Sequence, residues 1–151
     1  YHREQAIDKE VVNMFVAGKS IPKIGEIRFG YASDDESRLI THKYVGVHPY
    51  LVVSNNTYNK SSGQCEVIPF TTKRIGKYNP VHVEYKAGEV SGLIKDSTLI
   101  IEGRDTLRNC QLSEPVGEFT EGNWERVVEA MKVQCPFLRK ESTDSPVLTI
   151  A

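Results

Sequence analysis

The residues best suited to chemistry in this sequence are a histidine, His48, and a threonine, Thr71. Between them lie two short apolar runs, residues 49–54 and 65–70, separated by the polar residues 55–63, which are rich in Asn, Ser and Gly. Two such runs around a turn-rich segment predict an antiparallel β-hairpin. In that pairing the residue that enters the first strand lies opposite the residue that leaves the second. We therefore expect an imidazole and a hydroxyl to meet at the open end of the hairpin.

An imidazole at this place would bring proton exchange to the site. Its unperturbed pKa is about 6.5, so His48 can change protonation state near neutral pH. A strand-end histidine without a chemical role is the alternative interpretation. The residues that follow the hairpin, 73–78, are basic and contain one glycine.

Further short strands are expected to position this hairpin. Residues 24–31 alternate, with Ile27, Phe29 and Tyr31 on one face, which predicts a half-buried strand. The later strands are expected at residues 81–86, 97–101 and, as a short addition, 110–112. Short strands joined by loops favour a small antiparallel barrel over a doubly wound sheet.

Helices are predicted at both ends of the chain. Residues 4–17 carry apolar side chains at helical spacing and are followed by Gly18. The final helix follows a capping Thr120 or Asn123 and ends at Pro136. Its apolar face consists of Trp124, Val127, Val128 and Met131.

Length and composition indicate one soluble domain. The chain has 151 residues, 39% hydrophobic and 26% charged, and no apolar run reaches the roughly 20 residues that span a bilayer. No apolar leader follows the N-terminus, so we expect a cytoplasmic protein rather than a secreted one. The net charge of −1 neither demands nor excludes nucleic acid as a ligand.

The cysteines and acidic residues do not indicate a metal site. Three cysteines without Cys-x-x-Cys spacing argue against a disulfide framework and against zinc, and favour reduced, mostly buried thiols. The segment 32–45 holds an acidic cluster and a basic one, Arg38, His42 and Lys43. The acids, at residues 34–36, lack the regular ligand spacing of metal-binding loops, so we expect neither a metal nor another cofactor.

Several segments resemble, in the right order, the MazF/PemK (Kid) toxins of type II toxin–antitoxin systems. They are residues 25–27 (GEI), 46–53 (GVHPYLVV), 55–63 with 67–72 (VIPFTT), 80–84 and 96–102. The resemblance covers about residues 24–134. It implies a mainly β, SH3-like antiparallel barrel with a C-terminal helix, which we place at 24–138. The N-terminal helical extension (1–23) and the tail (139–151) lie outside the resemblance.

The resemblance also implies an activity. Proteins of this family are usually homodimers that cleave single-stranded RNA without a metal, and a cognate antitoxin peptide blocks the RNA site. In such cleavage the 2′-hydroxyl attacks the adjacent phosphate and leaves a 2′,3′-cyclic phosphate, which requires a base, a cation and an acid. By resemblance, Thr71 corresponds to the family's threonine and can hydrogen-bond a phosphate oxygen. Lys73 and Arg74 would follow the RNA backbone, although a solvated loop is the alternative for each.

Two departures from the family pattern concern charge. The family's arginine before proline is His48 here, and a histidine supplies less fixed charge and no bidentate fork for phosphate. The family's E-x-x-R-T element reads Glu102-Gly103-Arg104-Asp105-Thr106, so the arginine stands one place early. Arg104 would still support the RNA site if the chain bends at Gly103, and a surface ion pair with Asp105 or Glu102 is the alternative.

Aromatic residues and a second histidine complete the candidates. Tyr58 and Tyr78 could stack on RNA bases, although exposed loop tyrosines often do not. His82 lies on the polar face of its strand, and we expect it to be inert.

Two hypotheses of different classes follow. The first is an endoribonuclease toxin with His48 as acid–base, Thr71 as hydrogen-bond donor to phosphate, and Lys73, Arg74 and Arg104 as electrostatic support. The second is a catalytically weak or inactive module that binds RNA or an antitoxin peptide on the same fold. Inhibition of gyrase, which some relatives on this fold perform, has no support in this sequence beyond the fold.

Overall fold

The computed structural model describes residues 17–33 and 43–139. The N-terminal helix expected over residues 4–17 lies, apart from Ala17, outside the described residues. The acidic cluster at 34–36 and the tail from residue 140 also lie outside them.

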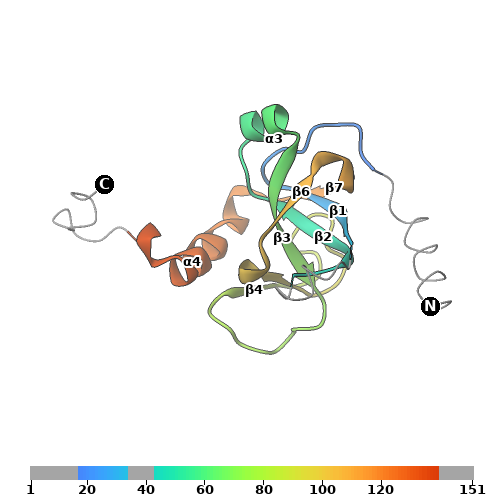
Figure 1. The fold of residues 1–151 in the computed structure, drawn as a ribbon. Coiled ribbons are helices and arrows are strands. Elements are labelled where there is room, and N and C mark those ends of the chain that lie inside the picture. Colours follow the sequence, from blue (N-terminus) through green and yellow to red (C-terminus); the bar gives the residue numbers. More distant parts are fainter. Residues whose placement is uncertain (1–16, 34–42, 140–151) are drawn as a thin grey trace, which may run out of the picture.

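The described chain forms an antiparallel sheet of seven strands (Figure 1). Along the path β4-β5-β3-β2-β1-β7 each strand is hydrogen-bonded to its neighbours, and β6 pairs with β3 beside this path. No pairing between described residues joins β4 to β7, so the sheet is not closed in the described part of the chain, and the SH3-like barrel stays a prediction. The strands are β1 (Glu26–Ala32), β2 (Gly46–Val52), β3 (Gln64–Thr71), β4 (His82–Tyr85), β5 (Ser97–Ile100), β6 (Asp105–Arg108) and β7 (Leu112–Glu118).

Strand β3 is the centre of the sheet because it has three partners. It pairs with β2 on one side, and on the other its first half pairs with β6 and its last two residues with β5. Between these two pairings stands Pro69, which has no amide hydrogen to donate to a ladder. The 3-10 turn η1 (Ile101–Gly103) connects β5 to β6 at this point. The arrangement places Thr71, the last residue of β3, between β2 and β5.

The predicted hairpin is present, but its polar connection is a helix rather than a loop. Residues of the connection form α3 (Asn56–Ser62). The side chain of Asn55 accepts a hydrogen bond from the Tyr58 amide at the N-terminus of α3, and Gly63 ends the helix with a φ of 73°. Asn and Gly are preferred at helix caps as well as in turns, so the same residues carry both signals.

The prediction of which side chains of β1 are buried is only partly correct. Ile27 is fully buried, but Tyr31 is 38% exposed and Arg28 is fully buried. The Arg28 guanidinium donates hydrogen bonds to the carbonyls of Ser113, at 2.9 Å, and of Ser20, at 3.1 Å. A guanidinium can be buried at this place because its donors are paired.

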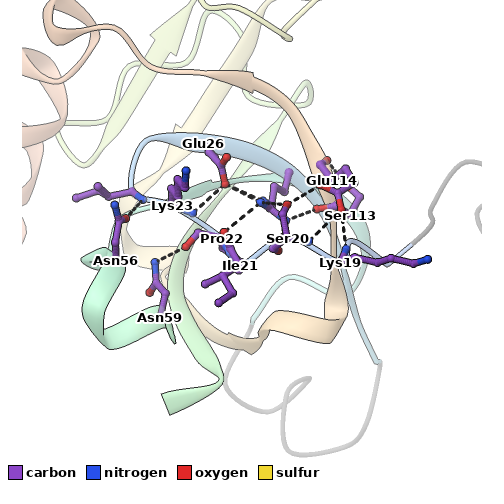
Figure 2. A network of polar contacts seen from close by, with 12 residues as sticks. Lys19, Ser20, Ile21, Pro22, Lys23, Glu26, Asn56, Asn59, Ser113 and Glu114 are labelled. Atoms are coloured by element: carbon purple, nitrogen blue, oxygen red, sulfur yellow. Dashed lines mark hydrogen bonds and ion pairs between the residues drawn. The ribbon is translucent and has the colours of Figure 1, made fainter. Parts of the chain in front are cut away.

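These contacts fasten the segment before β1 to the sheet. Figure 2 shows residues 19–23 lying between β1, α3 and β7 in one polar network. Glu26 lies 2.8 Å from the Arg28 guanidinium. Glu114 accepts hydrogen bonds from the Lys19 amide and from the amide and hydroxyl of Ser20, which together lower the pKa of this carboxyl to about 2.

The C-terminal helix covers the core beneath the sheet. It is α4 (Glu125–Gln134), and Val127 and Ala130 are its buried residues. The turn η4 (Pro136–Leu138) follows it, so the predicted stop at Pro136 is confirmed. The core against α4 contains the aromatic side chains of Phe70, Tyr85, Phe119 and Trp124.

Two strands differ from the sequence-based expectation. Strand β6 was expected to be only a charged stretch, and β7 begins at the end of the short strand expected over 110–112 and runs on to Glu118. In β6, Asp105 and Leu107 are buried and alternate with exposed neighbours, so the charged composition concealed a half-buried strand. The three cysteines are free thiols, of which Cys65 is buried and Cys110 is exposed.

Candidate functional site

His48 and Thr71 line the same cavity at the open end of the β2–β3 hairpin. The β2–β3 register pairs Tyr50 with Pro69, and continuing it by two residues brings His48 opposite Thr71. The cavity has a volume of about 600 Å³. Its lining consists of Lys43, Tyr44, Val45, His48, Thr71, Lys73 and Arg74.

The surroundings of His48 hold its ring in the neutral form. Nε2 lies 2.9 Å from the carbonyl oxygen of Val45, and because a carbonyl only accepts, Nε2 carries the hydrogen. Burial is the main cause that lowers the pKa of His48 below 6.5, and the Lys73 cation also lowers it. Hydrogen bonds to the Val45 and Phe70 backbone raise this pKa and so offset part of the shift. The edge of the Tyr44 ring, with 5.3 Å between centroids, supports the imidazole. In this state Nδ1 is the nitrogen that can take a proton.

Thr71 is buried and arranges the start of the basic loop. Its Oγ1 accepts a hydrogen bond of 3.2 Å from the Lys73 amide, which leaves the hydroxyl hydrogen available for another acceptor. Lys73 and Arg74 are exposed and stand beside it at the cavity. The chain thus places one hydroxyl donor and two cations within a single turn.

A third cation of the cavity, Lys43, was not predicted as a site residue. Its Nζ lies 3.3 Å from a carboxylate oxygen of Asp105 and 3.4 Å from the Arg104 carbonyl. The sequence signal was its place in the basic cluster just before β2. Its role in the cavity depends on contact with β6, which lies about 60 residues later and cannot be inferred from local spacing.

Arg104 does not line the cavity. Its guanidinium donates to the Ile101 carbonyl at 3.2 Å, lies 3.4 Å from the Met131 sulfur and also bonds the Gln134 side chain. Neither expected arrangement is therefore observed, because η1 turns this side chain toward α4. Asp105 pairs with Lys43 instead.

The two candidates for base stacking lie in different places. Tyr58 is part of α3 at the other end of the hairpin, where its hydroxyl accepts a hydrogen bond of 2.9 Å from Gln64. It is not among the residues that line the His48 cavity. Tyr78 belongs to the loop between β3 and β4 and is 92% exposed.

His82 is more enclosed than its expected position on a polar face implied. Its side chain is 10% exposed, and its Nε2 lies 2.6 Å from a carboxylate oxygen of Glu102. Because a carboxylate accepts, Nε2 donates the hydrogen in this pair.

Two classes of site find no match in the described residues. Within residues 17–33 and 43–139, no three His, Cys, Asp or Glu side chains are grouped so that they could hold a metal ion. No helix in the same ranges is long and apolar enough to cross a membrane.

Comparisons with known proteins identify relatives of this chain. Residues 31–135 match the model of a family described as PemK-like, MazF-like toxin of type II toxin–antitoxin system. No curated protein sequence matches.

Solved structures share the fold. MazF (Form-I) from Deinococcus radiodurans is 18% identical with a TM-score of 0.63, covering 78% of this chain and 99% of that chain. Mycobacterium tuberculosis toxin MazF-mt6 is 17% identical with a TM-score of 0.57, covering 74% of this chain and 96% of that chain. An endoribonuclease in complex with its cognate antitoxin from a mycobacterial species is 21% identical with a TM-score of 0.58, covering 76% and 95%.

Proposed function

The chain belongs to the PemK-like, MazF-like toxins of type II toxin–antitoxin systems, and we propose that it is a metal-independent endoribonuclease that cleaves single-stranded RNA. One observation carries this proposal. A neutral imidazole, a threonine hydroxyl and three cations converge on one cavity, which is the set that attack of a 2′-hydroxyl on a phosphodiester requires.

In the proposed reaction His48 moves the proton. Nδ1 takes the hydrogen of the 2′-hydroxyl as the oxygen attacks phosphorus, while the Val45 carbonyl holds Nε2–H and fixes the ring. The bond from phosphorus to the 5′-oxygen of the next nucleotide then breaks, and that oxygen takes up the proton. The products are a 2′,3′-cyclic phosphate and a free 5′-hydroxyl.

The other residues of the cavity stabilise the negative charge that develops on the phosphate oxygens. The Thr71 hydroxyl donates a hydrogen bond to a phosphate oxygen, and Lys73 and Arg74 supply positive charge. Lys43 adds a third cation at the wall of the cavity. These cations stand in for the fixed charge that the family's arginine would provide at position 48. In this proposal Arg104 supports the RNA site only if its guanidinium moves away from α4. Tyr58 contacts RNA only if the RNA extends to the α3 end of the hairpin.

The experiment is cleavage of a long RNA in the presence of EDTA, with the new ends mapped by sequencing. The expected result is cuts that carry a 5′-hydroxyl and a 2′,3′-cyclic phosphate. A His48→Ala, Thr71→Ala double variant serves as the control for contaminating nuclease. Equal cutting by wild type and this control would refute the enzyme.

The alternative is a module that binds RNA or an antitoxin peptide without cutting. It is motivated by the histidine at the arginine position, since an imidazole gives the phosphorane no permanent charge. Tight binding of RNA that is recovered intact would favour it.

We also propose a cytoplasmic homodimer that a cognate antitoxin peptide inhibits. The solved toxin–antitoxin complexes of relatives support the inhibition. Size-exclusion chromatography with light scattering, with and without the antitoxin, tests the assembly.

A further inference from the structure

Two buried polar atoms next to the His48 cavity have no hydrogen-bond partner in the described part of the chain. They are Oγ1 of Thr98, a residue that is 1% exposed, and Nδ1 of His82, whose side chain is 10% exposed. Both side chains line a second cavity, of about 310 Å³. A buried polar atom without a partner is costly, so two in one cavity call for an explanation, and a ligand is one.

The second cavity is joined to the first by the sheet. Thr71 of the His48 cavity pairs with Thr98 on β5, and Thr98 pairs with Glu84 on β4. Residues directly paired across strands point to the same face, and neighbouring strands lie about 4.8 Å apart. The row Thr71, Thr98, Glu84 therefore leads from one cavity into the other.

One loop separates the two cavities. Lys73 and Arg74 at its start line the His48 cavity, and residues 76–79 form a wall of the second. The loop is held down at Gly76, whose amide donates to Glu84 Oε2 at 3.1 Å. Tyr78, 92% exposed, stands at the edge of the second cavity with its ring open to a flat partner.

The polar groups of the second cavity include acceptors beside two donors, the Lys77 cation and the Asn79 amide. His82 donates through Nε2 to Glu102, and in the neutral ring its Nδ1 would be an acceptor. Glu84 adds a carboxylate, and the Thr98 hydroxyl can accept or donate. A ligand that fits presents N–H donors to the acceptors and a flat ring system to Tyr78. A cavity of this volume is at the small end of ligand pockets and suits one ring system rather than a folded element.

We propose that this second cavity binds one base of the RNA, next to the nucleotide that is cut. The base is one with an exocyclic amino group, adenine, cytosine or guanine, which donates to Glu84 and His82 Nδ1 while Tyr78 stacks on its face. Uracil is disfavoured because its edge offers a single N–H between two carbonyl oxygens and so cannot donate to both acceptors. This inference rests on the proposed action on RNA and names a determinant of its sequence preference.

The test measures base preference separately from cutting. A random-sequence RNA pool with 2′-O-methyl riboses can bind but lacks the attacking hydroxyl. The molecules retained by the protein are sequenced for wild type, Thr98→Val and Glu84→Gln. The matched control is Thr57→Val, which removes the same hydroxyl from an exposed position of α3.

The expected result is depletion of uracil by roughly tenfold at one position, the scale of a paired base contact. This depletion should fall below about threefold in Thr98→Val and in Glu84→Gln, and persist in Thr57→Val. Melting curves show whether each variant is folded. If only one of Thr98→Val and Glu84→Gln is folded, that variant alone is enough for the test. Wild-type binding without any uracil-depleted position, or depletion equal in all four proteins, would overturn the inference.

The test of the base site can fail or succeed separately from the test of nuclease activity. A uracil-depleted position in the modified pool, together with unmodified RNA left intact, would refute cutting and keep the base site. Efficient cutting with no change of preference in Thr98→Val and Glu84→Gln would refute the base site and keep the nuclease.

Discussion

Two cavities on one face of the sheet contain the same residue types in different surroundings. The first presents His48 and Thr71, and the second presents His82 and Thr98. In both, Nε2 of the histidine donates to an oxygen. The two threonines are themselves paired across β3 and β5.

The difference lies in the charges around each histidine. Lys43, Lys73 and Arg74 line the first cavity, which has no carboxylate among the described residues of its lining, whereas the second is lined by one carboxylate, Glu84, and one cation, Lys77. Glu102 holds the histidine of the second cavity. A cationic surrounding suits a phosphate, and one that contains acceptors suits amino groups. Residue type alone therefore does not assign a role to a histidine or a threonine, and the neighbouring charges do.

The largest effect that this contrast predicts comes from His48→Ala. Loss of a general acid–base costs about 10²- to 10⁴-fold in rate, so the single-turnover rate of RNA cleavage should fall by that factor. Because the neutral imidazole carries no charge, affinity for 2′-O-methyl RNA should fall less than threefold. A large loss of affinity at an unchanged cleavage rate would mean that His48 only binds.

The second effect concerns the cations of the first cavity. The double variant Lys73→Ala, Arg74→Ala should bind single-stranded RNA roughly tenfold more weakly and reduce the slope of log affinity against log salt by about 1.4, or 0.7 for each lost phosphate contact. Fluorescence anisotropy at several salt concentrations measures both quantities. Lys95→Ala, an exposed lysine outside both cavities, is the control. An unchanged slope would show that these cations do not touch the RNA.

The first cavity could be predicted further from the sequence than the second. The position of His48 opposite Thr71 follows from two apolar runs, because strand pairing has a period of two and a short connection fixes its register. The choice of helix for the connection could not be predicted, since Asn55 and Gly63 favour turns and helix caps alike.

The features that could not be predicted from the sequence depend on contacts between segments far apart in the chain. The contact of Lys43 with Asp105 requires β6, which a charged composition concealed. Arg104 points to α4 because η1 turns the chain one residue before it. Thr98 becomes notable only because its hydroxyl has no partner within residues 17–33 and 43–139, and no local sequence pattern indicates that.

The third effect tests the second cavity without RNA. Thr98→Val removes a buried hydroxyl that lacks a partner among the described residues, so the free protein should become more stable by about 1 kcal/mol. For a domain of this size the melting temperature would rise by about 2–4 °C. Thr57→Val, at an exposed site, should change it little. A fall in melting temperature for Thr98→Val would show that the hydroxyl has a partner in the free protein.

The smallest effect is a displacement of the pH profile, and it separates the two kinds of surroundings most directly. Burial and the Lys73 cation lower the pKa of His48 below 6.5, and the reactive form is the neutral ring. The single-turnover rate should therefore be level near neutral pH and fall on an acid limb with its midpoint below 6.5, as the ring becomes protonated. Lys73→Ala removes a repelling charge and should move that midpoint upward, toward 6.5, whereas Lys95→Ala should leave it in place. A midpoint that moves down in Lys73→Ala would mean that Lys73 does not act on His48 through its charge, and the proposed contrast between the two cavities would lose its electrostatic basis.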